Sequence, residues 1–185
     1  MPKNRQDLDN SLKKQMIKDS ARNIFLADGY EKTSITRISK QAGVTANTIY
    51  WYFSGKDELF AAVLEELISV FVSALSQRSE TYSLEENLLW MLESFQFAKP
   101  LIITVHERSA ISDAVATVHN NFHNSVESLL GKVLNESGFE AARIKPVIRI
   151  ASFVVEGLLM HEVSIKEKQE IVKQLLAILS PLRDK

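Results

Sequence analysis

The stretch that decides the fold runs from Thr33 to Phe60, TSITRISKQAGVTANTIYWYFSGKDELF. It predicts two short helices joined by a tight turn, with a third helix beginning directly afterwards. Ser34 and Thr45 stand at N-cap positions, where a hydroxyl accepts a hydrogen bond from a free backbone N–H. Gly43 stands where the first helix must end in a left-handed residue, which glycine adopts without a steric penalty. Two helices separated by a short turn that contains a glycine form the helix-turn-helix pattern.

The second helix of this pattern carries side chains that suit a DNA groove. They are short, polar or aromatic rather than charged: Ala46, Asn47, Thr48, Tyr50 and Trp51. Small side chains permit a close approach to base edges in the major groove. The stretch therefore predicts a recognition helix from Ala46 to Tyr52.

At these residues the sequence resembles the TetR family of bacterial transcriptional regulators. The similarity rests on Thr33-Ser34, Ile38, Ala42 to Thr45, Ile49 to Phe53 and Lys56 to Leu59, about a quarter of the chain. The resemblance implies an all-α fold, with an N-terminal three-helix helix-turn-helix head and a C-terminal antiparallel helical domain for ligand binding and dimerisation. The alternative is a helical hairpin in some other all-helical protein, which would not need an aromatic run before a lysine at a helix start.

The domain boundary is expected at the start of the third helix. Residues 1–54 would form the DNA-binding domain and residues 55–185 the effector-binding and dimerisation domain, with helix 55–79 connecting the two. Ser54 as N-cap with Asp57 three residues later is a weak form of the capping box, and apolar residues then recur at helical spacing to about Ser79.

The rest of the chain predicts helices throughout. The first is expected from about Leu8 or Asn10 to Ala27, and the later ones at about 84–100, 101–110, from Ser112 or Asp113 to about Asn135, 147–160 and 166–182. Residues 1–9 are expected to form a disordered basic arm. Pro146 is expected to open a helix, with residues 139–145 as a turn or a separate helical turn.

Composition and charge fit a soluble globular protein of 185 residues, with 45% hydrophobic and 24% charged residues. The absence of cysteine excludes disulfides and thiolate chemistry. The net charge of −1 argues against a general nucleic-acid binder. However, residues 1–60 hold ten Lys and Arg against seven Asp and Glu, which is weak support for phosphate contacts at one end.

No segment of the sequence predicts a membrane or secretory role. The N-terminus through Lys14 is polar and lacks the apolar core of a signal peptide. The apolar run from Ile150 to Met160 is interrupted by Ser152 and Glu156 and is too short to span a bilayer. We therefore expect a cytoplasmic protein without membrane contact.

The family resemblance implies that Tyr50, Trp51 and Lys56 hold the phosphate backbone of DNA. Trp51 departs from the histidine that is commoner at this position, so it could contact a sugar or a base instead. The resemblance also implies that a basic residue near the start of the first helix reaches a phosphate. The candidates are Lys13, Lys14 and Lys18.

Other residues of the helix-turn-helix are candidates by their own chemistry. Thr45 and Thr48 offer hydroxyls and main-chain donors at a helix N-terminus, which is a standard anion site. Base readout is expected from Arg37, Thr45, Ala46 and Asn47, which face outward from the turn. Asn47 could pair with adenine and Arg37 with guanine.

The middle and end of the chain hold candidates for a small-molecule pocket. They are mostly aromatic with a few polar groups, as binding pockets are: Trp90, Phe95, His106, Phe122, His123, Phe153, Glu156 and Met160. Plain core packing is the alternative for each. Glu156 must be paired if it is buried, with a ligand cation, a histidine or an arginine, and it could equally lie at a dimer interface.

The last two predicted helices carry more apolar surface than one contact requires. A two-fold dimer in which each subunit gives two helices to a four-helix bundle would bury the surplus. The expected contacts are Val155, Leu158, Leu159, Ile171, Leu175 and Ile178. A monomer whose last helix covers the core is the alternative.

Catalysis, a cofactor and a metal site are not expected. His119 and His123 are spaced i, i+4, but the helix lacks the acidic residue of a zinc-protease motif. The sequence also lacks a glycine-rich phosphate loop.

The predicted function is a homodimeric regulator, most simply a repressor, that leaves a palindromic operator when a small, lipophilic effector binds. The resemblance suggests that helix 56–79 transmits this change. The alternative is a DNA-anchored protein-interaction or architectural factor without an effector.

Overall fold

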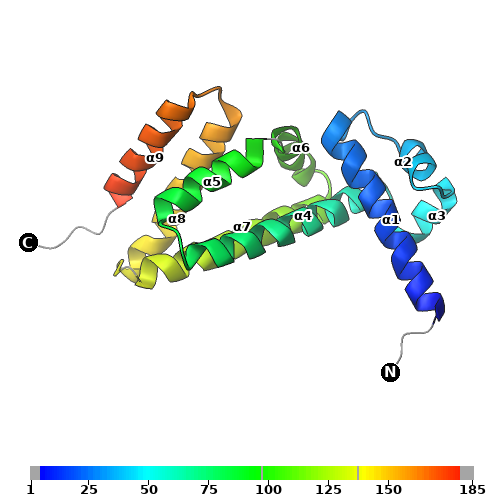
Figure 1. Ribbon diagram of the computed structural model, residues 1–185, viewed down its shortest axis with the longest axis horizontal. Helices are drawn as coiled ribbons and strands as arrows, with labels where there is room; N and C mark the ends of the chain where they lie inside the picture. The colour runs from blue at the N-terminus through cyan, green and yellow to red at the C-terminus, as the bar shows by residue number, and fades with distance from the viewer. Residues whose placement is uncertain (1–4, 97, 137, 180–185) are drawn as a thin grey trace, which may run out of the picture. The chain divides into compact units, whose positions relative to one another are not determined.

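The computed structural model describes residues 5–96, 98–136 and 138–179, and every regular element in this part of the chain is a helix, as predicted (Figure 1). The helices are α1 (Arg5–Asp28), α2 (Ile35–Gln41), α3 (Ala46–Tyr52), α4 (Lys56–Ser79), α5 (Leu84–Gln96), α6 (Lys99–Ser109), α7 (Asp113–Glu136), α8 (Ala141–Met160) and α9 (Ile165–Leu179).

Two local predictions were wrong. Residues 5–9 belong to α1 rather than to a disordered arm, and residues 1–4 lie outside the described part. Pro146 lies inside α8, which begins five residues earlier than the proline predicted. A proline removes one backbone hydrogen bond from a helix. Here Ala141 and Ala142, the first two helical residues and strong helix formers, extend the helix ahead of the proline.

The chain divides into two compact units, which we call the head unit and the body unit. The head unit comprises residues 1–69 and 100–120, and the body unit comprises residues 70–99 and 121–185. The helices α4 and α7 each contribute residues to both units. The domain boundary after Ser54 stays a prediction, and the head unit also takes in residues beyond it.

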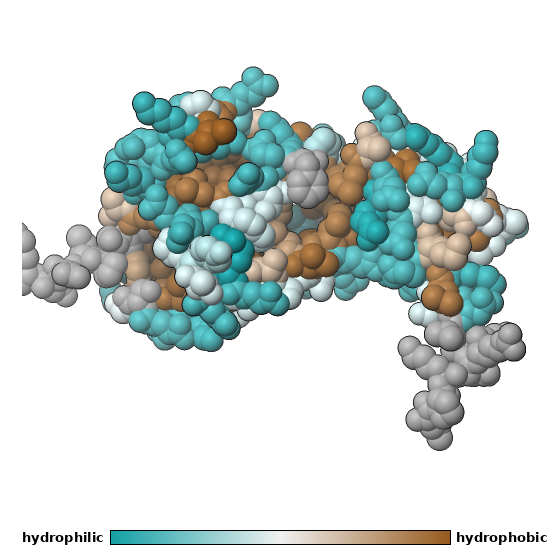
Figure 2. Space-filling view, viewed as in Figure 1, coloured by the Kyte–Doolittle hydropathy of each residue, from teal (hydrophilic) through white to brown (hydrophobic). Residues whose placement is uncertain are grey.

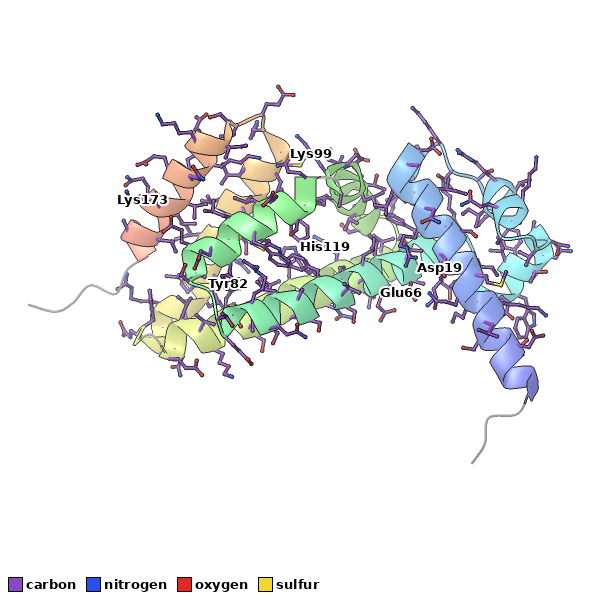
Figure 3. All side chains as sticks on the ribbon, in the orientation of Figure 1. Asp19, Glu66, Tyr82, Lys99, His119 and Lys173 are labelled. Carbon is purple, nitrogen blue, oxygen red and sulfur yellow. The ribbon has the colours of Figure 1, made fainter. Side chains whose placement is uncertain are left out.

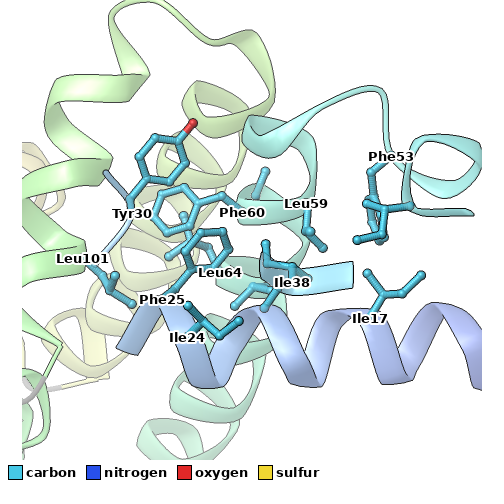
Figure 4. Packing of buried hydrophobic residues seen from close by; sticks show 14 of the residues in the cluster. Ile17, Ile24, Phe25, Tyr30, Ile38, Phe53, Leu59, Phe60, Leu64 and Leu101 are labelled. Carbon is cyan, nitrogen blue, oxygen red and sulfur yellow. The ribbon is translucent and has the colours of Figure 1, made fainter. Parts of the chain in front are cut away.

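The core of the head unit is built around aromatic rings on α1, its C-terminal turn and α4 (Figure 4). The rings of Phe25 and Phe60 meet edge to face at 5.1 Å, and Tyr30 packs against both. Ile38 of α2 and Leu101 of α6 are buried in the same cluster. This shared core fixes the helix-turn-helix on α1 and α4.

One buried cluster of the body unit lies on α7, α8 and α9, and α5 packs against α8 and α9. Leu134, Val147, Ile148, Ala151 and Leu175 form this cluster. The α8 residues in this cluster recur at helical spacing, so one face of α8 is buried inside a single chain.

The helix α4 has the length and apolar composition to cross a membrane. However, Leu59, Phe60, Val63 and Leu64 of its first turns are buried in the head core. Core helices of soluble proteins can have the same length and apolar composition, so these two properties alone do not indicate a membrane span.

Candidate nucleic-acid interface

The turn between α2 and α3 has the geometry that the sequence predicted. Ser34 Oγ accepts from the N–H of Arg37 at 3.2 Å, and Thr45 Oγ1 accepts from the N–H of Thr48 at 3.2 Å. Gly43 has a φ of +66°, and the N–H of Val44 returns to the carbonyl of Ser39. A side chain at position 43 would be strained in this backbone conformation, so the glycine sets the angle between the two helices.

The recognition helix α3 has one anchored and one exposed face. Ile49 is fully buried, and Phe53, its C-cap, is 2% exposed. Tyr50 is 54% and Trp51 69% exposed, and Asn47 is exposed as well. An isolated helix of this length is not stable in water, so the buried side chains hold α3 in place while the exposed ones remain free for contact.

The N-terminus of α3 presents the two threonines that were predicted as an anion site. Thr45 Oγ1 and Thr48 Oγ1 lie 2.9 Å apart and share a hydrogen bond. Thr45 is exposed, whereas Thr48 and Ala46 are half-buried. The predicted anion site is therefore accessible at Thr45, and the small side chain of Ala46 leaves room beside it for DNA to approach closely.

Arg37 is exposed on α2 but already holds a partner. Its Nη2 lies 2.5 Å from Asp28 Oδ2 at the end of α1. An exposed ion pair of this kind contributes little to stability. The guanidinium can therefore exchange Asp28 for a guanine edge at small cost, and its base contact stays a prediction.

Lys56 is held by the head unit itself. Its Nζ donates to the carbonyls of Tyr30 and Thr33, each at 3.0 Å, and lies 3.9 Å from the centre of the Tyr30 ring. Burial lowers the pKa of Lys56 below its ordinary value. Because an ammonium group has three donors, one N–H remains for the predicted phosphate contact.

The basic residues on α1 are mostly paired. Lys18 forms an ion pair with Glu66 of α4, and Lys13 pairs with Asp9 at 3.0 Å. Asp19 of α1 lies on the side that faces Glu66 (Figure 3). Lys14 instead lies over the Phe53 ring at 5.3 Å. Much of the surface of α1 is hydrophilic (Figure 2), and among the three predicted lysines Lys14 is the best placed for a phosphate.

A polar cluster that sequence reasoning missed joins α6 to the start of α4. Arg108 donates from Nε to Asp57 Oδ1 at 3.0 Å and pairs through Nη2 with the other carboxylate oxygen. The Tyr30 hydroxyl also donates to Asp57. Arg108 is 51 positions from Asp57 in the chain, so no local pattern could reveal the pair. Asp57 was predicted to cap α4 with Ser54, but the N–H of Ser54 donates to Glu58 instead.

The contacts of this cluster shift its titration. Burial acts to raise the pKa of Asp57, but hydrogen bonds from Arg108 and Tyr30 outweigh it and hold the pKa below the ordinary value. Burial and the bond to Asp57 raise the pKa of Tyr30. The cluster therefore favours an ionised Asp57 beside a neutral Tyr30 at neutral pH.

We expect Asp57→Asn to destabilise the head unit by about 2 kcal/mol at pH 7, because Arg108 loses its carboxylate. The lowered pKa means that this stabilisation is complete above the ordinary carboxyl pKa and is lost as pH falls through the folded-state value. The difference between wild type and variant should therefore shrink below about pH 4. Urea unfolding at pH 7 and pH 3 measures it. Glu107→Gln, at an exposed carboxylate on α6, is the control, and a difference that grows in acid would contradict the assignment.

The predicted pocket residues fall into separate groups. Trp90, Phe95 and Phe122 take part in ring contacts in the body unit. Glu156 has His123 as its partner, with Oε1 and Nε2 3.9 Å apart, and both side chains are about one-third exposed. His106 belongs to the head unit, where its ring contacts His119. An open groove of about 440 Å³ in the body unit is lined elsewhere, by residues such as Gly131 and Ile148.

The burial of side chains on the two faces of α8 differs from several roles that the sequence predicted. Val155, Leu158 and Leu159 were predicted as dimer contacts, but they are 6%, 4% and 3% exposed in the single chain. Phe153 and Met160 were predicted to line a pocket, but they are 65% and 44% exposed. The helical period places these two sets on opposite sides of α8, and only packing shows which side is buried.

On α9, Leu175 is buried within the chain and Ile171 is half-buried. The side chain of Ile178 lies outside the described residues. No group of three or more His, Asp or Glu side chains in the described ranges could hold a metal ion.

Three comparisons place this geometry among known proteins. Residues 17–63 match the family model "Bacterial regulatory proteins, tetR family". The chain is 41% identical over 51 residues to the HTH-type transcriptional regulator SrpR of Pseudomonas putida, which is 28% of this chain and 24% of that protein. The chain thus spans about a quarter of the length of this relative.

Longer matches have lower identity. An uncharacterised HTH-type regulator of Bacillus subtilis, YhgD, is 26% identical over 164 residues, 85% of each chain. A transcriptional regulator from Rhodococcus sp. Rha1 shares the fold, with a TM-score of 0.75 and 17% identity over 89% of this chain and 94% of that chain. The matched family and relatives are regulators rather than enzymes.

Proposed function

We propose that the chain is a member of the TetR family of bacterial regulatory proteins, to which residues 17–63 are similar, and that it is a DNA-binding transcriptional regulator. The supporting observation is the exposed face of α3, where Asn47, Tyr50 and Trp51 project from a helix anchored by Ile49. A helix held in this way enters the major groove as a rigid body. Arg37, Thr45, Ala46 and Thr48 would complete the contact surface, with Lys56 on a phosphate.

The protein acts as a homodimeric repressor in the cytoplasm and reads a palindromic operator. Each recognition helix occupies one half-site, with the two half-sites roughly 34 Å apart. A small, lipophilic effector that binds better to the DNA-free state pulls the dimer from the operator, because only a difference in affinity shifts the equilibrium.

The dimer forms through the outer face of α8, which we define as Ile150, Phe153, Gly157 and Met160. These residues follow one another at spacings of three and four, so they share one side of the helix. Ile150 is 48% exposed, and a Cβ built on Gly157 meets nothing within 4 Å. An exposed apolar stripe around a small residue suits close packing against the same stripe of a second copy.

The test of function is a fluorescence-anisotropy titration of the purified protein against its own upstream DNA and against scrambled DNA, across a range of salt concentrations. We expect tighter binding to the upstream DNA, a steep salt slope and two subunits or a multiple per site. Equal affinity for both DNAs at every salt concentration would contradict the proposal for that operator. Specific binding that no compound reverses would favour the DNA-anchored factor without an effector.

Two substitutions on α3 separate base readout from phosphate contact. Asn47→Ala should cost about 1–3 kcal/mol of discrimination at one or two base pairs, because its amide pairs with base edges. Tyr50→Phe should weaken binding to all DNAs by a similar factor, since a phosphate contact carries no sequence information. Titrations against operators with single base changes measure both, with Asn135→Ala at an exposed position of α7 as control. Identical profiles for the two variants would contradict these roles.

A further inference from the structure

Aromatic rings form a continuous row in the body unit. Trp90 of α5 stacks on Phe71 of α4, with ring centres 5.2 Å apart and planes at 7°. Phe71 contacts Phe95 at 4.5 Å, and Phe95 contacts Phe122 of α7 at 6.1 Å. All four side chains are half-buried rather than fully buried. The row therefore offers ring faces on which another aromatic group can stack.

Arg78 stands at the Trp90 end of this row. Its guanidinium carbon lies 4.8 Å from the centre of the Trp90 ring and 4.1 Å from that of Tyr82. The charge of Arg78 helps the hydrogen bonds from Ser83 to lower the pKa of Glu86, but the Nε of Arg78 is buried without a hydrogen-bond partner among the described residues. A buried N–H without an acceptor is costly, so this donor calls for one.

Asn87, a second neighbour of Tyr82, carries a complementary group. The side chain is 6% exposed, and its Nδ2 donates to the carbonyl of Tyr82 at 3.1 Å. Its Oδ1 is buried without a hydrogen-bond partner among the described residues. Asn87 and Trp90 are three residues apart on α5 and so share one face of that helix. An unpaired donor and an unpaired acceptor therefore both adjoin Tyr82 and Trp90.

Arg78 Nε and Asn87 Oδ1 together restrict which ligand group can satisfy both of them. A carboxylate accepts from Arg78 Nε but cannot donate to Asn87 Oδ1, and an ammonium group donates but cannot accept. A hydroxyl group does both. We infer that this end of the row binds the hydroxyl of a hydroxyaromatic compound, such as a phenol or naphthol, whose ring lies against the row. The inference rests on the proposed function, since this compound would be the effector.

Tyr82 contacts both Arg78 and Asn87. It lies in the connection between α4 and α5 (Figure 3), and its side chain is 45% exposed. Its ring lies against the Arg78 guanidinium.

The test is isothermal titration calorimetry of the full chain, without DNA, using three probes with the same ring system. They are 2-naphthol, naphthalene and 2-naphthoate. We expect 2-naphthol to bind about tenfold more tightly than either of the others, because it alone satisfies both atoms. Arg78→Lys and Asn87→Leu should each reduce naphthol affinity to the naphthalene level and leave naphthalene binding unchanged.

Naphthalene binding and the thermal midpoint report whether each variant is folded. Arg149→Lys, at an exposed arginine on α8, is the matched control and should bind all three probes as wild type does. Tightest binding of 2-naphthoate, equal affinity for naphthol and naphthalene, or no binding of any probe would each overturn the inference. The operator titration is independent of these results, so this inference can fail while the DNA-binding proposal stands.

Discussion

Phe60→Ala is expected to destabilise the head unit by about 4 kcal/mol, within the range for truncating a buried phenylalanine. Phe60 is fully buried, and its ring meets those of Phe25 at 5.1 Å and Tyr30 at 4.9 Å. These neighbours come from α1 and from the segment after it, so they cannot both move into the space left by the ring. Such a loss lowers the folding equilibrium constant of the head roughly a thousandfold.

Hydrogen exchange of α2 and α3 amides, together with urea unfolding, measures this effect. Operator binding should weaken in parallel, because the short helix α3 has no stability apart from this core. The control is Val70→Ala in the same helix, α4. The Val70 side chain is 71% exposed, so its truncation should change the free energy of unfolding by less than about 0.5 kcal/mol. A loss below about 1 kcal/mol for Phe60→Ala would show that the ring is not packed as described.

Phe153→Glu is expected to convert the proposed dimer into a monomer. Phe153 is 65% exposed in the single chain and lies at the centre of the outer face of α8. In a two-fold dimer the substitution places two carboxylates in an apolar contact, and the loss of an aromatic anchor alone costs about 2–4 kcal/mol. The dimer dissociation constant should rise at least about thirtyfold. Operator affinity should fall further, because a monomer reads one half-site.

Analytical ultracentrifugation at several protein concentrations measures the first effect, and anisotropy with the operator measures the second. Lys173→Glu is the control. It also introduces a carboxylate, but at an exposed position on the polar side of α9. The thermal midpoint of Phe153→Glu should stay close to that of the wild-type chain diluted below its dimer dissociation constant. A variant that remains dimeric and binds the operator normally would show that copies meet through another face.

The sequence alone determined the parts of this protein whose causes are local. The caps at Ser34 and Thr45 and the left-handed Gly43 depend on residues three or four positions apart, and the structure has them as predicted. The extent of α4 follows in the same way from its apolar spacing. The resemblance that indicates DNA binding lies in the same stretch, Thr33 to Phe60, where the residue types at the caps and the turn determine the local backbone conformation.

The tertiary structure alone decided which partners and faces are used. Glu156 was expected to pair with a ligand cation, a histidine or an arginine, and the structure gives it a histidine, His123. Arg108 binds Asp57 instead, a pairing that the sequence did not predict. The buried face of α8 was likewise unpredictable, because an apolar residue stands on both sides of the helix and a single sequence does not state which side packs. Such pairings depend on groups that are distant in the chain and compete for the same partners, and only packing of the whole unit selects among them.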